Sequence, residues 1–112
     1  MWEIQHELLG LLVPGAVACE IFAAGQRAFK KRGLTHPWGT LGHSIGLSIH
    51  EGFELSQDSQ RVLAAGMILN IEPSHIEPGD ARYQIEDSVL ISSAGPEVLS
   101  TCIDTRRMFE IL

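Results

Sequence analysis

Hydrophobic residues recur at helical spacing over the first third of the chain. One broad apolar face near the N-terminus is formed by Trp2, Leu8, Leu9, Leu11 and Leu12. This spacing predicts an amphipathic helix. Pro14-Gly15 then interrupts the pattern, so the dipeptide either ends this helix or begins the next one.

A second helix is predicted from Ala16 to Arg32. Its apolar face is formed by Val17, Ile21, Ala24 and Ala28, with Phe22 and Phe29 beside it. Three cationic residues at 30–32 occupy the last turn, where positive charge complements the helix dipole. Gly33 follows directly and is expected to cap the C-terminus.

From Thr35 onward the pattern changes to short β-like runs that are separated by glycine and proline. Residues 66–75 and 81–92 are predicted strands, and residues 77–80 are the turn between them. Gly95-Pro96 predicts another turn, and residues 97–102 a last strand, whereas the pattern of residues 104–112 is ambiguous. Two helices followed by mainly antiparallel strands make the predicted fold class α+β.

The composition is that of an ordinary globular protein, with 45% hydrophobic and 20% charged residues among 112. The net charge of −6 disfavours a phosphate-backbone binder, so no nucleic-acid partner is expected. The start of the chain has no basic leader, and the apolar stretch Leu8 to Ala18 is too short to span a bilayer. Cys19 and Cys102 are predicted to be reduced, packed thiols of a cytoplasmic protein, with a disulfide as the alternative.

The hairpin around Pro78-Gly79 is the most informative segment for chemistry. If its strands pair symmetrically about Gly79, Glu72 lies opposite Glu86. Opposed Cβ atoms are about 4.5–5.5 Å apart, and like charges at that distance repel. A shared proton, an arginine or a metal ion is needed to offset this repulsion. Pro73 cannot donate a ladder hydrogen bond, and a bulge there would shift the register by one residue.

Alternation along the two strands sorts their side chains into two faces. The predicted polar face holds Asn70, Glu72, Ser74, Gln84, Glu86 and Ser88. The predicted core face holds Leu69, Ile71, Tyr83, Ile85, Val89 and Ile91.

A second candidate element is the segment Gly42-His43-Ser44-Ile45-Gly46, which His50 and Glu51 follow. Glycines beside His43 permit a close approach of backbone or ligand, and neutral imidazole is a common metal ligand. His43 and His50 are seven residues apart, so a regular strand would point them to opposite faces. A bulge at Gly46 would let them converge. His36 and His75 are expected to be solvent-facing residues and not ligands.

Four ordered motifs resemble those of the pita-bread metallopeptidases, the family of methionine aminopeptidase, prolidase, aminopeptidase P and creatinase-like enzymes. They are Gly42 to Glu51 (Gly-His-x-x-Gly, then His-Glu), Gly66 to Pro73 (Gly-Met and Glu-Pro), Ile85 to Leu90 (Ile-Glu-Asp) and Gly95 to Ser100. The resemblance covers nearly the whole chain. It implies that residues 1–112 form a single partial domain, the C-terminal half of the catalytic domain, with a curved antiparallel sheet.

The resemblance also implies roles for four residues. His43 and Glu72 would ligate one ion of a dinuclear pair, and Glu86 would bridge both ions. His50 would contact substrate and steady the tetrahedral intermediate, and Glu72 would also shuttle a proton. In this family two divalent ions per complete site, of manganese, cobalt, iron or zinc, activate a water that attacks the bond after an N-terminal residue. The implied activity is that of an Xaa-Pro aminopeptidase or prolidase.

Several family features are absent from this sequence. Two aspartate ligands come from strands that precede these helices in the family, and Asp58, Asp80, Asp87 and Asp104 lie in the wrong order to replace them. An upstream substrate-side histidine is missing as well. Ser44 replaces a commoner glycine. Gln84 stands where prolidase-like members often carry an arginine.

Three interpretations of function therefore stay open. The first is the metallo-aminopeptidase, to which this chain contributes part of the dinuclear site, with one ion or none bound by the chain alone. The second is a catalytically inactive binding module, and the third is a creatinase-like hydrolase of a non-peptide amide. The expected partners are a peptide substrate and either a preceding N-terminal half or a second copy of the chain in a homodimer. No membrane partner is expected.

Overall fold

Two helices precede seven short strands in the computed structural model, which describes residues 1–79, 81–102, 104 and 106. The helices are α1 (Trp2–Leu9) and α2 (Ala18–Lys31). The strands are β1 (Thr40–Ile45), β2 (Glu54–Ser56), β3 (Ile68–Ile71), β4 (Ser74–Ile76), β5 (Arg82–Gln84), β6 (Asp87–Ser92) and β7 (Gly95–Val98). The predicted order of two helices followed by an antiparallel sheet is confirmed.

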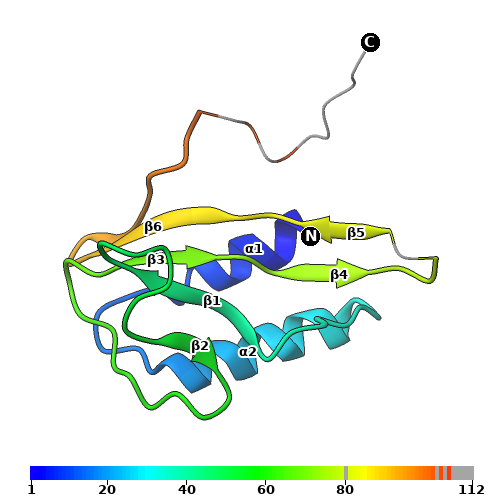
Figure 1. Ribbon diagram of the computed structural model, residues 1–112, viewed down its shortest axis with the longest axis horizontal. Coiled ribbons are helices and arrows are strands. Elements are labelled where there is room, and N and C mark those ends of the chain that lie inside the picture. The colour runs from blue at the N-terminus through cyan, green and yellow to red at the C-terminus, as the bar shows by residue number, and fades with distance from the viewer. Residues whose placement is uncertain (80, 103, 105, 107–112) are drawn as a thin grey trace.

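The strands form a five-stranded sheet of order β2-β1-β3-β6-β7 and a separate two-stranded ladder, β4-β5. Every pairing is antiparallel. Figure 1 shows that β4 continues the course of β3 and β5 continues into β6, so the β4-β5 hairpin projects beyond the main sheet. The two predicted strands are therefore each divided in two, and the division falls at Glu72-Pro73 and Ile85-Glu86.

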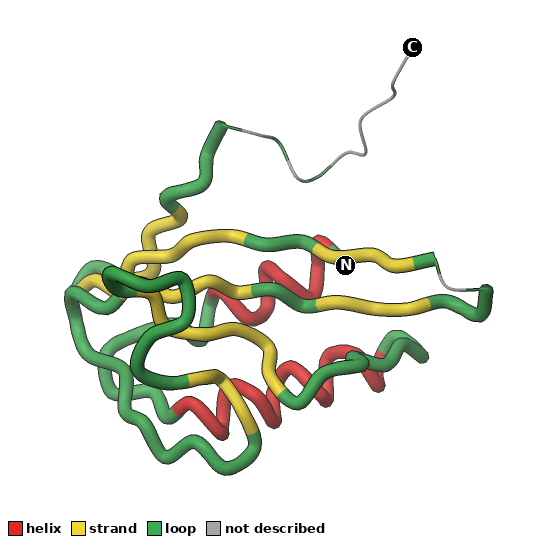
Figure 2. Tube along the Cα trace, viewed as in Figure 1, coloured by secondary structure: helices red, strands yellow, loops and turns green. Residues whose placement is uncertain are grey.

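Both helices lie against one face of the sheet, which leaves the other face open (Figure 2). The fully buried side chains between these layers include Ile4, Leu8, Leu12, Ile21, Phe29, Leu41, Leu69, Ile71, Val89 and Ile91. Burial of one side chain of this size contributes roughly 1.5–3 kcal/mol. Helix α2 lies so close to β1 that a Cβ atom at position 25 would be 2.2 Å from the Cδ1 atom of Leu41. Gly25, which has no Cβ, permits this approach.

Helix α2 ends in the glycine cap that the sequence predicts. Gly33 has a φ of 69°, its N–H donates to Lys30 O at 3.1 Å, and Leu34 N–H donates to Phe29 O at 3.0 Å. This pair of bonds is a Schellman motif, which satisfies carbonyls that the helix end leaves free. The preceding residue, Arg32, links the two helices through its ion pairs with Glu3 and Glu7, at 3.1 and 2.6 Å.

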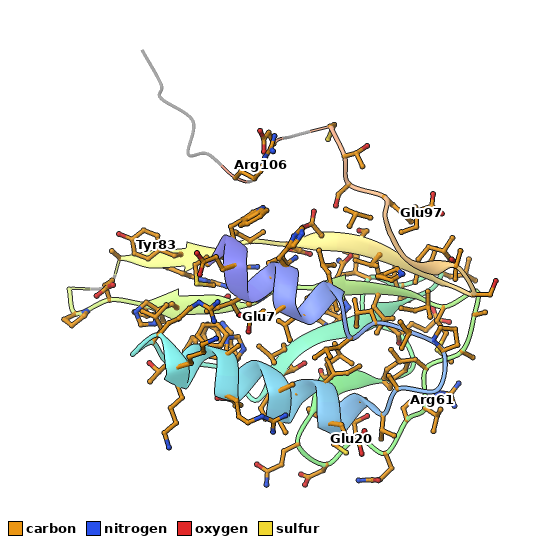
Figure 3. All side chains as sticks on the ribbon, turned by 180° about the vertical axis from the view of Figure 1, so that it is seen from behind. Glu7, Glu20, Arg61, Tyr83, Glu97 and Arg106 are labelled. Atoms are coloured by element: carbon orange, nitrogen blue, oxygen red, sulfur yellow. The ribbon has the colours of Figure 1, made fainter. Side chains whose placement is uncertain are left out.

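Several predictions differ from the structure. The last strand is β7 and not residues 97–102. The predicted turn at Gly95-Pro96 was also wrong, because Gly95 already pairs with Ser92 and the turn falls at residues 93–94. Tyr83, predicted in the core, is 44% exposed because β5 lies on the projecting hairpin (Figure 3). Cys19 is partly buried and Cys102 exposed, both as free thiols, so the prediction of packing was wrong for Cys102.

Two predicted features fall at the edge of the description. Asp80, the last residue of the predicted turn at 77–80, lies outside the described residues. Most of segment 104–112 lies outside them as well. Asp104 itself pairs with Arg106, whose guanidinium lowers the pKa of that carboxyl to about 2. Among the helices that are described, neither is long and apolar enough to cross a membrane.

Candidate metal centre

Glu72 and Glu86 lie across from each other where the main sheet passes into the projecting hairpin. Ile71 pairs with Asp87 on one side of this point, and Ser74 pairs with Gln84 on the other. The same register therefore holds on both sides, and it is the one predicted by symmetric pairing about Gly79. Pro73 causes no shift of register.

The ladder opens at the two glutamates for a local reason. Proline has no N–H to donate, so Pro73 contributes only its carbonyl, which accepts from Ile85 N–H at 3.3 Å. Glu72 N–H turns the other way and donates to Leu41 O of β1 at 2.9 Å. The strand that carries Glu72 is thus held by β1, the strand that carries His43.

His43 lies in the middle of β1, between Asn70 of β3 and Glu54 of β2. Its side chain is nearly enclosed, with 2% of the residue exposed. The neighbouring Gly42 is needed for this approach, because a Cβ there would lie 2.2 Å from Asn70 O. The imidazole Nε2 of His43 is 3.8 Å from Glu72 Oε1.

One ligand atom each from His43, Glu72 and Glu86 can be chosen so that all three lie within 4.8 Å of one another. His43 is buried, Glu72 is half-buried and Glu86 is exposed. The group is therefore accessible from the face of the sheet that the helices do not cover. An imidazole with two carboxylates is a donor set that suits manganese, iron, cobalt and zinc. The predicted ligands are therefore brought together, and their separation is compatible with one shared ion.

Neutral amides are the polar partners of the two carboxylates. Asn70 Nδ2 donates to Glu86 Oε1 at 2.9 Å, and Ser88 Oγ donates to Asn70 Oδ1 at 2.7 Å. Gln84 Nε2 lies 3.4 Å from Glu72 Oε2 and equally far from Glu86 Oε2. Within the described part of the chain, neither carboxylate forms an ion pair with lysine or arginine. A divalent cation fits this uncompensated pair.

His50 also reaches the site, although it is exposed and outside the three-residue group. Its ring stacks on the ring of His43, with centroids 3.6 Å apart and planes at 21°. A loop, and not a bulge at Gly46, brings the rings together. The loop, residues 46–53, is held against β1 by hydrogen bonds that Ser44 donates to Glu51 O and Phe53 O. Beside the rings is an open cavity of about 200 Å³, lined by His43, His50, Glu51, Gly52, Phe53 and Glu54.

His36 and His75 are structural residues, and the prediction that they face solvent was wrong. Each is 8% exposed. The ring nitrogens of His36 lie 2.6 Å from Thr40 O and 2.9 Å from Ser74 O, in the gap where β1 and β4 separate. His75 Nδ1 lies 2.8 Å from Thr35 O. Neither belongs to the group of potential metal ligands found among the described residues, and that they are not ligands stays a prediction.

Sequence reasoning missed one buried polar residue under the site, Gln5 of α1. It is 2% exposed, and its amide contacts β3 and β6. The signal that could have revealed it is its position: a glutamine directly after Ile4 and three residues before Leu8 lies at the margin of the buried face of α1.

Comparison with known proteins gives a consistent family. The model of metallopeptidase family M24 matches residues 1–93. The agropine synthesis cyclase of Rhizobium rhizogenes is 39% identical over 99 residues, which are 88% of this chain and 25% of that protein. An uncharacterized peptidase of Staphylococcus aureus is 43% identical over 60 residues, which are 54% of this chain and 17% of that protein.

Solved structures agree. The prolidase from Pyrococcus furiosus superposes with a TM-score of 0.84 at 33% identity, and the match covers 92% of this chain and 31% of that chain. The Xaa-Pro dipeptidase from Bacillus anthracis gives 0.83 at 30% identity, over 91% of this chain and 29% of that one. The chain belongs to metallopeptidase family M24, and it spans about a third or less of the length of these relatives.

Proposed function

We propose that this chain supplies part of the metal centre of a hydrolase that removes an N-terminal residue from a peptide, of the Xaa-Pro aminopeptidase or prolidase kind. The observation that carries the proposal is the group of His43, Glu72 and Glu86, whose ligand atoms lie within 4.8 Å of one another. Membership of family M24 and the likeness to a prolidase and an Xaa-Pro dipeptidase support it.

The proposed ligand roles follow the geometry and the family together. His43 and Glu72 would hold one divalent ion, and Glu86, the most exposed of the three, would also serve a second ion. Manganese, cobalt, iron and zinc all suit these donors. Three protein ligands leave coordination positions open, so the chain alone holds one ion weakly or none. The remaining carboxylates would come from a preceding half of the domain or from a second copy of this chain.

A bound divalent ion supplies Lewis-acid polarisation of the scissile carbonyl and lowers the pKa of an attacking water. Glu72 takes up a proton at the site, and the approach of its Oε1 to His43 Nε2, at 3.8 Å, supports this role. His50, exposed above His43, contacts the substrate and donates to the oxygen of the tetrahedral intermediate. The cavity beside the two rings receives part of the substrate.

The test is metal analysis combined with an assay on Xaa-Pro dipeptides and longer Xaa-Pro peptides, on the chain alone and on any complete form. Stoichiometric metal with turnover supports the proposal, and Glu86→Gln is the matched control that should lose both. A complete form that binds metal without turnover, or that binds no metal, contradicts the proposal and favours the inactive binding module.

A second candidate function is a reaction on a non-peptide substrate, such as a creatinase-like amide hydrolysis. This candidate is supported by the relative named agropine synthesis cyclase, whose match covers most of this chain and whose name is not that of a peptidase. Turnover of small non-peptide amides with no turnover of peptides would decide for this candidate. We also propose a cytoplasmic location, which free Cys19 and Cys102 support.

A further inference from the structure

We propose that Gln5 is a positioning residue for the metal ligands Glu72 and Glu86. The proposal rests on the proposed metal site. Gln5 lies on α1, on the covered face of the sheet, whereas the two glutamates point to the open face. It therefore acts on the ligands through the strands that carry them.

The side-chain amide of Gln5 contacts both of these strands directly beside the two glutamates. Gln5 Nε2 donates to Ile71 O at 3.2 Å and to Asp87 Oδ2 at 3.1 Å. Ile71 and Asp87 form the last register pair before the ladder opens. Ile71 directly precedes Glu72 and Asp87 directly follows Glu86, so the amide holds the immediate neighbours of both ligands.

The other carboxylate oxygen of Asp87 is held from the opposite direction. Ser100 Oγ donates to Asp87 Oδ1 at 2.7 Å and accepts from Ser88 N–H at 3.1 Å. Asp87 is 6% exposed, so these bonds form in a region largely shielded from water. Hydrogen bonds are stronger in such surroundings, and a buried carboxylate that loses a donor is costly.

Gln5 is poorly suited to a purely packing role. Its Oε1 atom is buried without a hydrogen-bond partner in the described structure, and an apolar side chain in its place would avoid that cost. What Gln5 provides instead is a pair of donors directed at two acceptors on neighbouring strands. Since proline at 73 weakens the ladder at the same point, these donors keep the two strands at a fixed separation where the ligands project.

The experiment compares Gln5→Met, which keeps the length of the side chain and removes the donors, with Ile4→Val, a change in the same buried layer that removes no hydrogen bond. Manganese affinity is measured by calorimetry, and the visible spectrum of bound Co²⁺ reports coordination geometry. Loss of an outer-shell partner typically weakens metal binding about 10–100-fold. We expect that loss and an altered Co²⁺ spectrum for Gln5→Met, and neither for Ile4→Val.

If Gln5→Met binds Mn²⁺ as tightly as Ile4→Val does, with the parent Co²⁺ spectrum, the positioning role is wrong. Should Gln5→Met fail to fold, Ser100→Ala loosens Asp87 from its other side and is expected to change affinity and spectrum in the same direction. A parent chain that binds no metal removes the affinity readout, and a complete form that also binds none overturns the proposed function instead. In that case the carboxyl ¹³C shifts of Glu72 and Glu86 in the metal-free chain still decide the matter: Gln5→Met must move both and Ile4→Val neither.

Discussion

The imidazole rings of His43 and His50 stack with their centroids 3.6 Å apart, although one residue is buried in β1 and the other is exposed in the following loop. The stack places His50 at the mouth of the candidate metal centre without adding it to the ligand group. Under the proposed function, this division would separate metal binding by His43 from substrate contact by His50.

His50→Phe is expected to preserve the stacked ring and remove both ring nitrogens. Because His50 is outside the ligand group, the melting temperature and Mn²⁺ affinity should stay close to those of the parent. Turnover by a complete site should fall by about 10²–10³-fold, the usual loss when a donor to a developing oxyanion is removed. Calorimetry and a peptide assay on the same samples check this, and a large loss of metal affinity would make His50 a ligand.

Glu86→Gln separates charge repulsion from metal binding. In chelator, the variant should be more stable than the parent by about 0.2–1 kcal/mol, because a like-charged opposed pair has been removed. In Mn²⁺ at a hundred times its dissociation constant, the parent should gain about 2.7 kcal/mol and the variant much less. Melting curves with and without chelator measure both effects. A variant that Mn²⁺ stabilises as much as it stabilises the parent would exclude Glu86 from the site.

Gly42→Ala and Gly46→Ala form a matched pair along one motif. A methyl group at 42 would lie 2.2 Å from the backbone oxygen of Asn70, whereas one at 46 would meet only the mobile end of Glu51. We expect Gly42→Ala to cost about 1–3 kcal/mol or more of stability and to disturb His43. Gly46→Ala should be mild. Denaturant unfolding distinguishes them, and equal losses would contradict the close approach of β1 to β3.

The Arg32–Glu7 ion pair predicts an acid-sensitive contact between the helices. The hydrogen bond from the Arg32 guanidinium lowers the pKa of Glu7 from 4.5. Since the folded-state pKa lies below the unfolded one, the contribution to stability is complete above pH 4.5 and is lost as pH falls through the folded-state pKa.

A carbon-detected NMR titration of the Glu7 carboxyl measures the shift. The midpoint should rise in Arg32→Gln and stay unchanged in the control Arg27→Gln. An identical midpoint in the parent and in Arg32→Gln would show that the ion pair does not form in solution.

The sequence alone was sufficient for the helix order, a glycine cap at Gly33 and the register that opposes Glu72 and Glu86. These features depend on local periodicity and on symmetric pairing about one turn, which residue spacing determines. The glycines beside His43 made it a candidate ligand, and the motif resemblance implied its role beside the two glutamates.

Features that depend on tertiary packing could not be predicted from the sequence. Tyr83 follows the core alternation of its strand, yet neither of the two described helices extends over the projecting hairpin to cover it. His36 and His75 have the sequence context of surface residues, but their rings are buried against backbone carbonyls of Ser74 and Thr35, about 40 residues away along the chain. Gln5 was missed because its partners are 66 and 82 residues away along the chain.

The most direct measurement is NMR of the isotope-labelled chain during titration with substoichiometric Mn²⁺, whose unpaired electrons broaden nearby signals. Broadening should begin at the side chains of His43, Glu72 and Glu86, extend next to His50, and disappear in Glu72→Gln. Broadening that instead begins at scattered exposed acidic residues such as Glu20 and Glu97, or that is unchanged in Glu72→Gln, would contradict a metal centre at this site.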